Sequence, residues 1–118
     1  MKLRYGMNPQ QATADATCVT PGSWPVRVVH GQPSFINMLD ALNGWPLVRE
    51  ASVMLGEVVA ASFKHVSPAG VATAGELDEA AREAWEVSEP LSDVASAYLR
   101  ARDVCPWWNA NTAARKSG

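Results

Sequence analysis

The chain has 118 residues, of which 47% are apolar and 19% charged, and its formal net charge is −2. This length allows one small domain or a piece of a larger one, and the composition argues against a wholly disordered protein. The basic residues are scattered rather than gathered in a stripe, which argues against a nucleic-acid partner.

Neither cysteine belongs to a recognisable motif. Cys18 and Cys105 are far apart in the sequence, so they predict neither a disulfide framework nor a zinc site. We interpret both as reduced thiols of a cytosolic protein. The first residues lack the apolar core of a signal peptide, and no apolar run is long enough to span a bilayer. We therefore expect a cytoplasmic protein with no membrane partner.

The first half of the chain predicts a turn-rich segment, a strand and an interrupted helix. Residues 6–25 are rich in Gly, Pro and Asn, and the β-branched run 26–30 predicts a short strand. Ser34 is a candidate N-cap for a helix whose apolar residues recur at helical spacing. Gly44 and Pro46 should end or kink this helix, and a second helical piece should continue to Gly56.

The second half alternates strand and helix signals. Residues 58–63, VVAASF, predict a strand buried on both faces, as in a parallel sheet under helices, and a turn is expected at 67–70. Residues 76–87 predict a helix, and Ser92 is a candidate cap for a last helix. This alternation favours an α/β layer. The tail, 103–118, with Trp107 and Trp108, shows no periodicity and should be irregular.

Lys64 and His65 directly follow the apolar strand, at the edge where open α/β sheets bind ligands. A histidine can accept a proton from an attacking nucleophile, and a lysine can act as an acid or stabilise an oxyanion. Both side chains can serve one site only if the strand ends or bulges there, because strand residues alternate in direction. Judged from spacing alone, such a pair is more often a solvent-exposed pair with no functional role.

Four segments, occurring in the same order and at similar spacings, resemble AICAR transformylase, the formyltransferase of purine biosynthesis. They are LRYGMNPQQ (3–11), FINMLDALNGWPLV (35–48), AASFKHVSPAGVA (60–72) and SAYLRAR (96–102). The resemblance implies a three-layer α/β/α fold like that of cytidine deaminases. Residues 1–102 would form one partial copy of the family's repeated unit, followed by the divergent tail 103–118.

The resemblance also implies an activity and a set of site residues. The family transfers a formyl group from 10-formyltetrahydrofolate, its co-substrate, to the 5-amino group of AICAR nucleotide, giving formyl-AICAR on the route to IMP. By this resemblance His65 would help to remove the amine proton, and Lys64 would support the oxyanion or protonate the leaving folate nitrogen. Four residues match positions expected to bind the nucleotide: Arg4, Tyr5, Gly6 and Asn37. No metal is expected, because the H-x-E and P-C-x-x-C motifs of zinc deaminases are absent.

The resemblance ends after Arg102, where the family continues with a Gly-Ala-Asp stretch, a Ser-Ser-Phe-Gly-Asp-like motif and a second layer. Pro46 and His30 are smaller departures. The family's active site also forms across a dimer interface, so a homodimer or a complementing formyltransferase chain is an expected partner. We therefore expect a fragment or a decayed gene product rather than a complete enzyme. The alternatives are a chain that only binds nucleotide or associates with an intact formyltransferase, and an unfolded relic.

Overall fold

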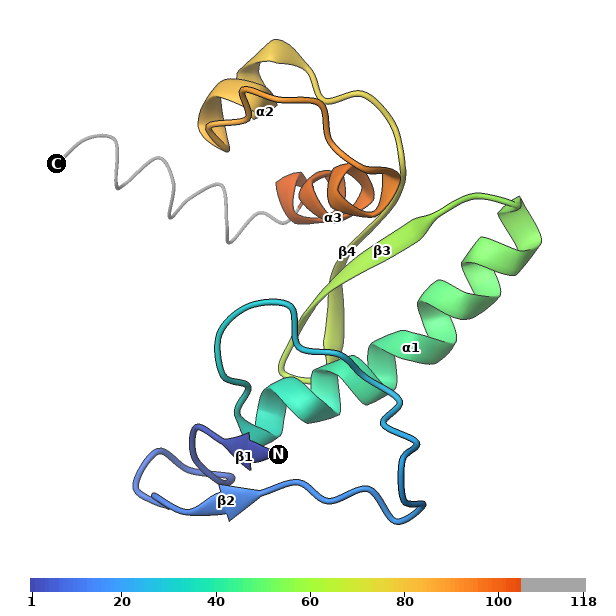
Figure 1. Ribbon diagram of the computed structural model, residues 1–118. Coiled ribbons are helices and arrows are strands. Elements are labelled where there is room, and N and C mark those ends of the chain that lie inside the picture. The colour runs from blue at the N-terminus through green and yellow to red at the C-terminus, as the bar shows by residue number, and fades with distance from the viewer. Residues whose placement is uncertain (105–118) are drawn as a thin grey trace, which may run out of the picture.

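The computed structural model describes residues 1–104, and the predicted tail lies almost wholly outside the described residues. Within that range the chain forms three helices and two small antiparallel sheets (Figure 1). In chain order the elements are β1 (Lys2–Leu3), β2 (Ala14–Asp15), α1 (Phe35–Leu55), β3 (Val59–Lys64), β4 (Ser67–Thr73), α2 (Glu79–Ala84) and α3 (Asp93–Asp103). The chain is therefore a mixed α/β unit.

The hairpin of β3 and β4 lies between two helices. Figure 1 shows α1 and α3 on opposite sides of this hairpin. Phe63 faces α1, since a Cβ on Gly44 would lie 3.2 Å from its ring. Gly70 faces α3 and lies against the carbonyl oxygen of Ala101. These two faces agree with the register, because Gly70 pairs with Ser62 and the next residue along β3 points the other way.

The prediction of a buried parallel sheet is wrong, although the strand itself is confirmed. β3 pairs with β4 in the antiparallel sense, and its residues are half-buried rather than enclosed on both faces. The reason is the connection. A parallel partner needs a crossover of about a dozen residues or more, whereas here the chain reverses within two residues.

The strand predicted at 26–30 is also wrong. Residues 26–30 have no strand conformation in the structure, and the side chain of Val29 is 87% exposed. β-branched residues favour strands mainly because they pack on a pleated, half-buried surface beside a partner strand. No such partner lies next to this run in the described part of the chain.

One continuous helix replaces the two predicted pieces. Ser34 caps α1 as expected, and the helix ends at Gly56, whose φ of 68° is the left-handed conformation common at helix ends. Pro46 lies inside the helix and does not end it. A proline removes the hydrogen bond to the carbonyl four residues earlier, here that of Leu42. Both residues are exposed, so water can reach that carbonyl.

Replacing Pro46 with alanine is expected to raise the free energy of unfolding by about 2 kcal/mol. A proline inside a helix costs roughly 3 kcal/mol, and part of that is offset because proline also restricts the unfolded chain. Urea denaturation monitored by far-ultraviolet circular dichroism would measure the change. Pro90→Ala, an exposed position outside the helices, is the matched control and should lower stability slightly. An unchanged midpoint for Pro46→Ala would contradict a continuous α1.

α2 is shorter than the predicted helix 76–87. It begins after Asp78, whose carboxylate accepts the Ala81 N–H at 2.7 Å. It ends where Glu86 adopts a φ of 55° and the N–H of Val87 donates to the Arg82 carbonyl at 2.8 Å. The N–H of Glu86 also donates to the Glu83 carbonyl at 3.2 Å. These two bonds form the Schellman motif, which ends a helix whatever the propensity of the residues beyond it.

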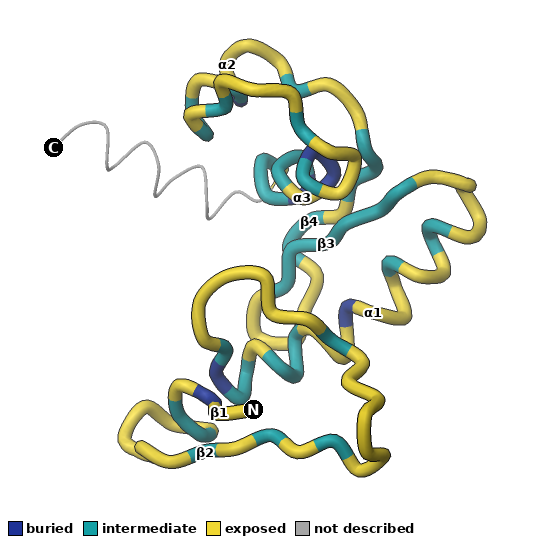
Figure 2. Tube along the Cα trace, in the orientation of Figure 1, coloured by how far each residue is buried: buried dark blue, intermediate teal, exposed yellow. Residues whose placement is uncertain are grey.

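Within residues 1–104, the side chains with the lowest exposure lie on the inner face of α3. Figure 2 shows few fully buried stretches, and two of the buried side chains, Ala97 and Ala101, belong to this helix. Arg100 holds α3 against the end of β4, because its Nη1 donates to the carbonyls of Thr73 at 2.7 Å and Ala74 at 2.9 Å. Small side chains and the two hydrogen bonds of Arg100, called the Arg100 clasp below, bring α3 close to the hairpin backbone. The helix predicted after Ser92 is thus confirmed.

α1 is the longest helix of residues 1–104, with 21 residues. It carries the charged side chains of Asp40, Arg49 and Glu50. Among the residues that the structure describes, no helix combines the length and the apolar character needed to cross a membrane.

Candidate functional site

The end of β1 lies against the start of α1. The N–H of Arg4 donates to the carbonyl of Pro33 at 2.8 Å, and the N–H of Phe35 donates to the carbonyl of Tyr5 at 3.4 Å. These bonds place the backbone of Arg4 and Tyr5 alongside the residues that flank the buried N-cap residue Ser34. Two residues that the sequence assigned to nucleotide binding are therefore anchored at the N-terminus of α1.

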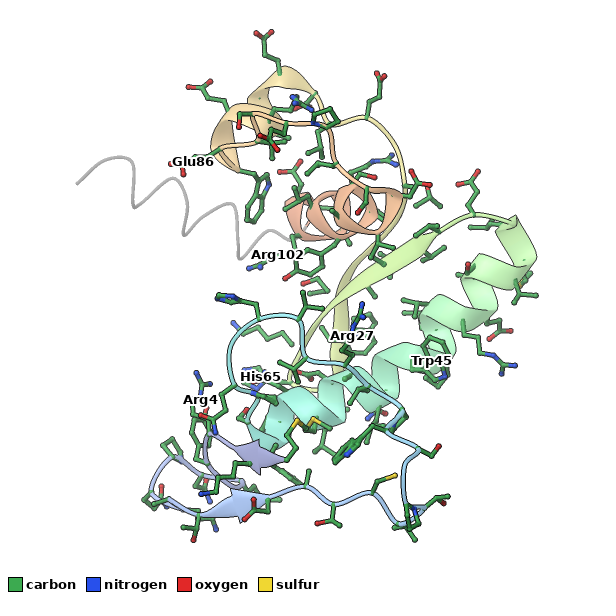
Figure 3. The ribbon with its side chains drawn as sticks, viewed as in Figure 1. Arg4, Arg27, Trp45, His65, Glu86 and Arg102 are labelled. Carbon is green, nitrogen blue, oxygen red and sulfur yellow. The ribbon has the colours of Figure 1, made fainter. Side chains whose placement is uncertain are left out.

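The tip of the β3–β4 hairpin is tied to the same helix. His65 and Val66 form the turn, with φ values of 51° and 63°. The N–H of Val66 donates to Oδ1 of Asp40, in the second turn of α1, at 2.7 Å. In Figure 3 the labelled side chains of Arg4 and His65 both lie beside the first turns of α1. The fold thus gathers segments far apart in the sequence around one helix end.

The turn predicted at 67–70 is wrong by a few residues. The chain reverses at His65 and Val66, and Ser67 to Gly70 already belong to β4. The register shifts between Ser62 and Phe63, so that β4 carries one extra residue at a bulge next to Pro68. A proline cannot donate to the ladder, and strands accommodate it at edges and bulges.

Lys64 and His65 are both exposed at the hairpin tip. Lys64 is the last residue of β3. The strand therefore ends at the position that would allow both side chains to serve one site. A shallow cavity is lined by Lys64, His65, Ser67, Pro68 and Ala69. An ammonium and an imidazole beside an open cavity can bind an anionic ligand and exchange protons with it.

Arg4 and Tyr5 form a pair of their own. Nη2 of Arg4 donates to the Tyr5 hydroxyl at 3.2 Å, and the guanidinium carbon lies 4.9 Å from the ring centroid. Stacking on the ring orients the exposed guanidinium, whose planar fork suits phosphate oxygens. Gly6 follows, and its N–H donates to the carbonyl of Gln11, which closes the loop between them. The Gln11 amide occupies the place where a Cβ on Gly6 would lie.

Asn37 has a structural role at the start of α1. Its Oδ1 accepts hydrogen bonds from the N–H and the hydroxyl of Ser34, both at 3.0 Å, and together the two residues form a capping box. This fixes the side-chain oxygen and leaves the amide Nδ2 as the group that could meet a ligand. Asn37 also lines a cavity of about 500 Å³ between α1 and β3, together with Asp40, Gly44 and Phe63.

Asp40 is a site residue that the sequence reasoning missed. A lone aspartate inside a helical pattern is typical of a solvated face, and the sequence gives no signal for its partner 26 residues later.

Among residues 1–104 there is no group of three or more His, Cys, Asp and Glu side chains that could hold a metal ion. Cys18 is a free thiol whose Sγ lies 2.9 Å from the carbonyl oxygen of Ser23.

Comparison with known proteins gives a consistent result. Residues 1–98 match the family described as AICARFT/IMPCHase bienzyme. The bifunctional purine biosynthesis protein PurH of Staphylococcus epidermidis is 37% identical over 90 residues, and that of Staphylococcus saprophyticus is 36% identical over the same length. Each alignment covers 71% of this chain and 17% of the relative, so the chain spans a small part of the relatives that it matches.

Proposed function

This chain belongs to the AICARFT/IMPCHase bienzyme family, and from that premise we propose that it carries part of a formyltransferase site of cytoplasmic purine biosynthesis. The reaction is formyl transfer from 10-formyltetrahydrofolate to the 5-amino group of AICAR nucleotide, giving formyl-AICAR. The observation that carries the proposal is the common anchorage on α1 of the Arg4–Tyr5 segment and the Lys64–His65 turn. This arrangement puts a candidate phosphate contact and two candidate proton-transfer groups at one helix end.

The proposed roles follow from the chemistry of the amine. Its lone pair is withdrawn by the ring and the carboxamide, so attack on the formyl group needs a base and a stabilised tetrahedral intermediate. His65 would take the proton from the amine. Lys64 would stabilise the oxyanion or give a proton to the departing folate nitrogen. Arg4 and Tyr5 would hold the nucleotide phosphate, and Gly6 and Asn37 would contribute further nucleotide contacts.

We also propose that the β3–β4 hairpin, with α1 and α3 on its two faces, is one partial copy of a cytidine-deaminase-like α/β/α layer. The outer edges of β3 and β4 pair with no other strand among residues 1–104. Edges of this kind are where further strands of such a sheet would add.

The second candidate function is binding without catalysis. The chain spans 17% of the length of its staphylococcal relatives, and it lacks the Ser-Ser-Phe-Gly-Asp-like motif with which the family continues after the position of Arg102. In this alternative the chain binds AICAR nucleotide alone, or associates with a second copy or an intact formyltransferase chain that supplies the folate site. Both functions require the same nucleotide contacts, so nucleotide binding is the first property to test.

Replacing Arg4 with alanine is expected to weaken the binding of AICAR nucleotide about tenfold or more. A bidentate, charge-assisted contact to phosphate is worth at least the roughly 1.4 kcal/mol that corresponds to tenfold. Isothermal titration calorimetry of the purified chain at low salt would measure the dissociation constants. Arg49→Ala removes an exposed arginine from the C-terminal half of α1 and is the charge-matched control, with no expected effect.

The outcomes separate the two candidate functions. Saturable binding that Arg4→Ala weakens supports a nucleotide site, and a formyl-transfer assay then distinguishes an enzyme from a binding protein. A rate that does not exceed the rate in buffer, measured with folded protein, would exclude independent turnover. Equal weakening by Arg4→Ala and Arg49→Ala would indicate attraction by net charge, and absence of binding to the folded chain would contradict both functions.

A further inference from the structure

We propose that Asp40 is the positioning residue of the Lys64–His65 turn. The inference rests on the proposed function of that pair and names a further residue of the same site. Asp40 would not touch the substrate. It would act through the backbone, because its carboxylate accepts the N–H of Val66, the residue directly after His65, at 2.7 Å. This bond links the turn directly to α1.

The turn needs such a support because its residues do not favour its shape. Both central residues have positive φ, as in the tight hairpin turns that normally contain glycine or asparagine. A β-branched residue with positive φ is a rare conformation, and left-handed non-glycine residues cost on the order of 1–3 kcal/mol each. His65 and Val66 therefore keep this geometry where the surrounding structure imposes it.

Asp40 supplies the missing interaction from outside the hairpin. In a two-residue turn the N–H of the second central residue has no partner across the ladder, and a carboxylate is the strongest neutral-pH acceptor for it. Asp40 is half-buried and stands on a helix of rigid backbone, so the acceptor has a defined position. The bond converts an exposed hairpin tip into a turn with one favoured orientation.

The same helix also holds the proposed nucleotide contacts. α1 starts at the segment that binds the backbone of Arg4 and Tyr5, and Asp40 follows in its second turn. Asp40 therefore fixes the distance between the proposed phosphate contact and the proposed proton-transfer pair. Orientation of this kind matters for catalysis, since small misplacements of reacting groups lower rates strongly.

Three variants test the proposal: Asp40→Ala, Asp40→Asn and Glu50→Ala. Asparagine keeps an oxygen acceptor in the same place, whereas alanine removes it. Glu50→Ala removes an exposed carboxylate from the same helix and controls for net charge and helix stability. The first readout is hydrogen exchange of the Val66 amide and the chemical shifts of the His65 ring signals in nuclear magnetic resonance. The second is the affinity for AICAR nucleotide.

In Asp40→Ala we expect the Val66 amide to exchange about tenfold faster and the His65 signals to shift, with the urea midpoint changed little. Affinity for AICAR nucleotide should fall about fivefold, while Asp40→Asn stays within about twofold of the parent and Glu50→Ala matches it. Rescue by asparagine is the result that a general loss of stability would not produce.

The proposal is overturned if the Val66 amide and the His65 signals are the same in the parent and in Asp40→Ala. It is also overturned if Asp40→Asn behaves as badly as Asp40→Ala in both readouts, because the acceptor would then not be the cause. If the parent chain binds no AICAR nucleotide, the proposed function fails. The exchange and ring signals still decide whether Asp40 holds the turn.

Discussion

A Gly70→Ala chain is expected to lose about 3 kcal/mol of unfolding free energy. A Cβ at this position would collide with the carbonyl oxygen of Ala101 in α3 and lie 2.7 Å from Cγ2 of Val104, the C-cap residue of that helix. Overpacking usually costs 1–3 kcal/mol, and the upper end applies here because the nearest atom is backbone and cannot rotate away. Urea denaturation followed by circular dichroism would measure the loss.

Gly44→Ala is the matched control for this prediction. Its Cβ would also lie in a buried place, 3.2 Å from the ring of Phe63, but that neighbour is a half-buried side chain that can shift. Alanine also favours a helix over glycine by roughly 0.5–1 kcal/mol. The net change at Gly44 should therefore be small. Equal stabilities of the two variants would show that α3 does not pack on Gly70 as described.

The segment FKHVSPAG combines residues that have a structural role with residues that have a proposed chemical role. Gly70 is small because a helix lies against it, and Pro68 marks a bulge in the strand. Lys64 and His65 are the exposed members, at the tip. In Gly70→Ala the hairpin should move relative to α3, so nucleotide affinity should fall only to the extent that the fold is lost. His65→Asn, which keeps a residue type tolerated at positive φ, should in contrast affect the site with little effect on stability.

An Arg100→Ala chain is expected to lose about 2–3 kcal/mol of unfolding free energy. The Arg100 guanidinium donates to the carbonyls of Thr73 and Ala74, and removal leaves two half-buried acceptors without this donor. Hydrogen bonds to charged groups contribute about 1.5–3 kcal/mol, more than neutral ones, and unpaired acceptors carry a desolvation cost. Thermal and urea denaturation would both report the loss.

Arg100→Lys distinguishes the clasp from a simple charge effect. Lysine keeps the positive charge, but its ammonium stands on a flexible four-carbon stem without the fixed planar geometry of the guanidinium, so it should restore part of the stability. Arg49→Ala, which removes an exposed arginine from α1, should change the free energy of unfolding by less than about 0.5 kcal/mol. If Arg100→Ala were as stable as Arg49→Ala, the described contact between α3 and the end of β4 would be wrong.

Local signals in the sequence were sufficient for several elements. Ser34 and Ser92 were recognised as helix caps, and Gly56 as the end of α1, because a cap is formed by residues within one turn of it. The apolar run before Lys64 was recognised as a strand. The four segments quoted from the chain were enough to place it in its family. All of these signals are complete within short windows of sequence.

The tertiary structure decided which strand pairs with β3, whether α1 continues through Pro46, and what Asp40 contacts. The direction of β4 depends on a two-residue turn with positive φ at His65 and Val66, which their side chains do not predict. Pro46 is tolerated within α1 at a place where both Pro46 and Leu42, the residue whose carbonyl loses its partner, are exposed. The role of Asp40 depends on a backbone N–H far along the chain. A short stretch of sequence cannot reveal such distant contacts, because their free energy arises only when the helix and the hairpin pack together.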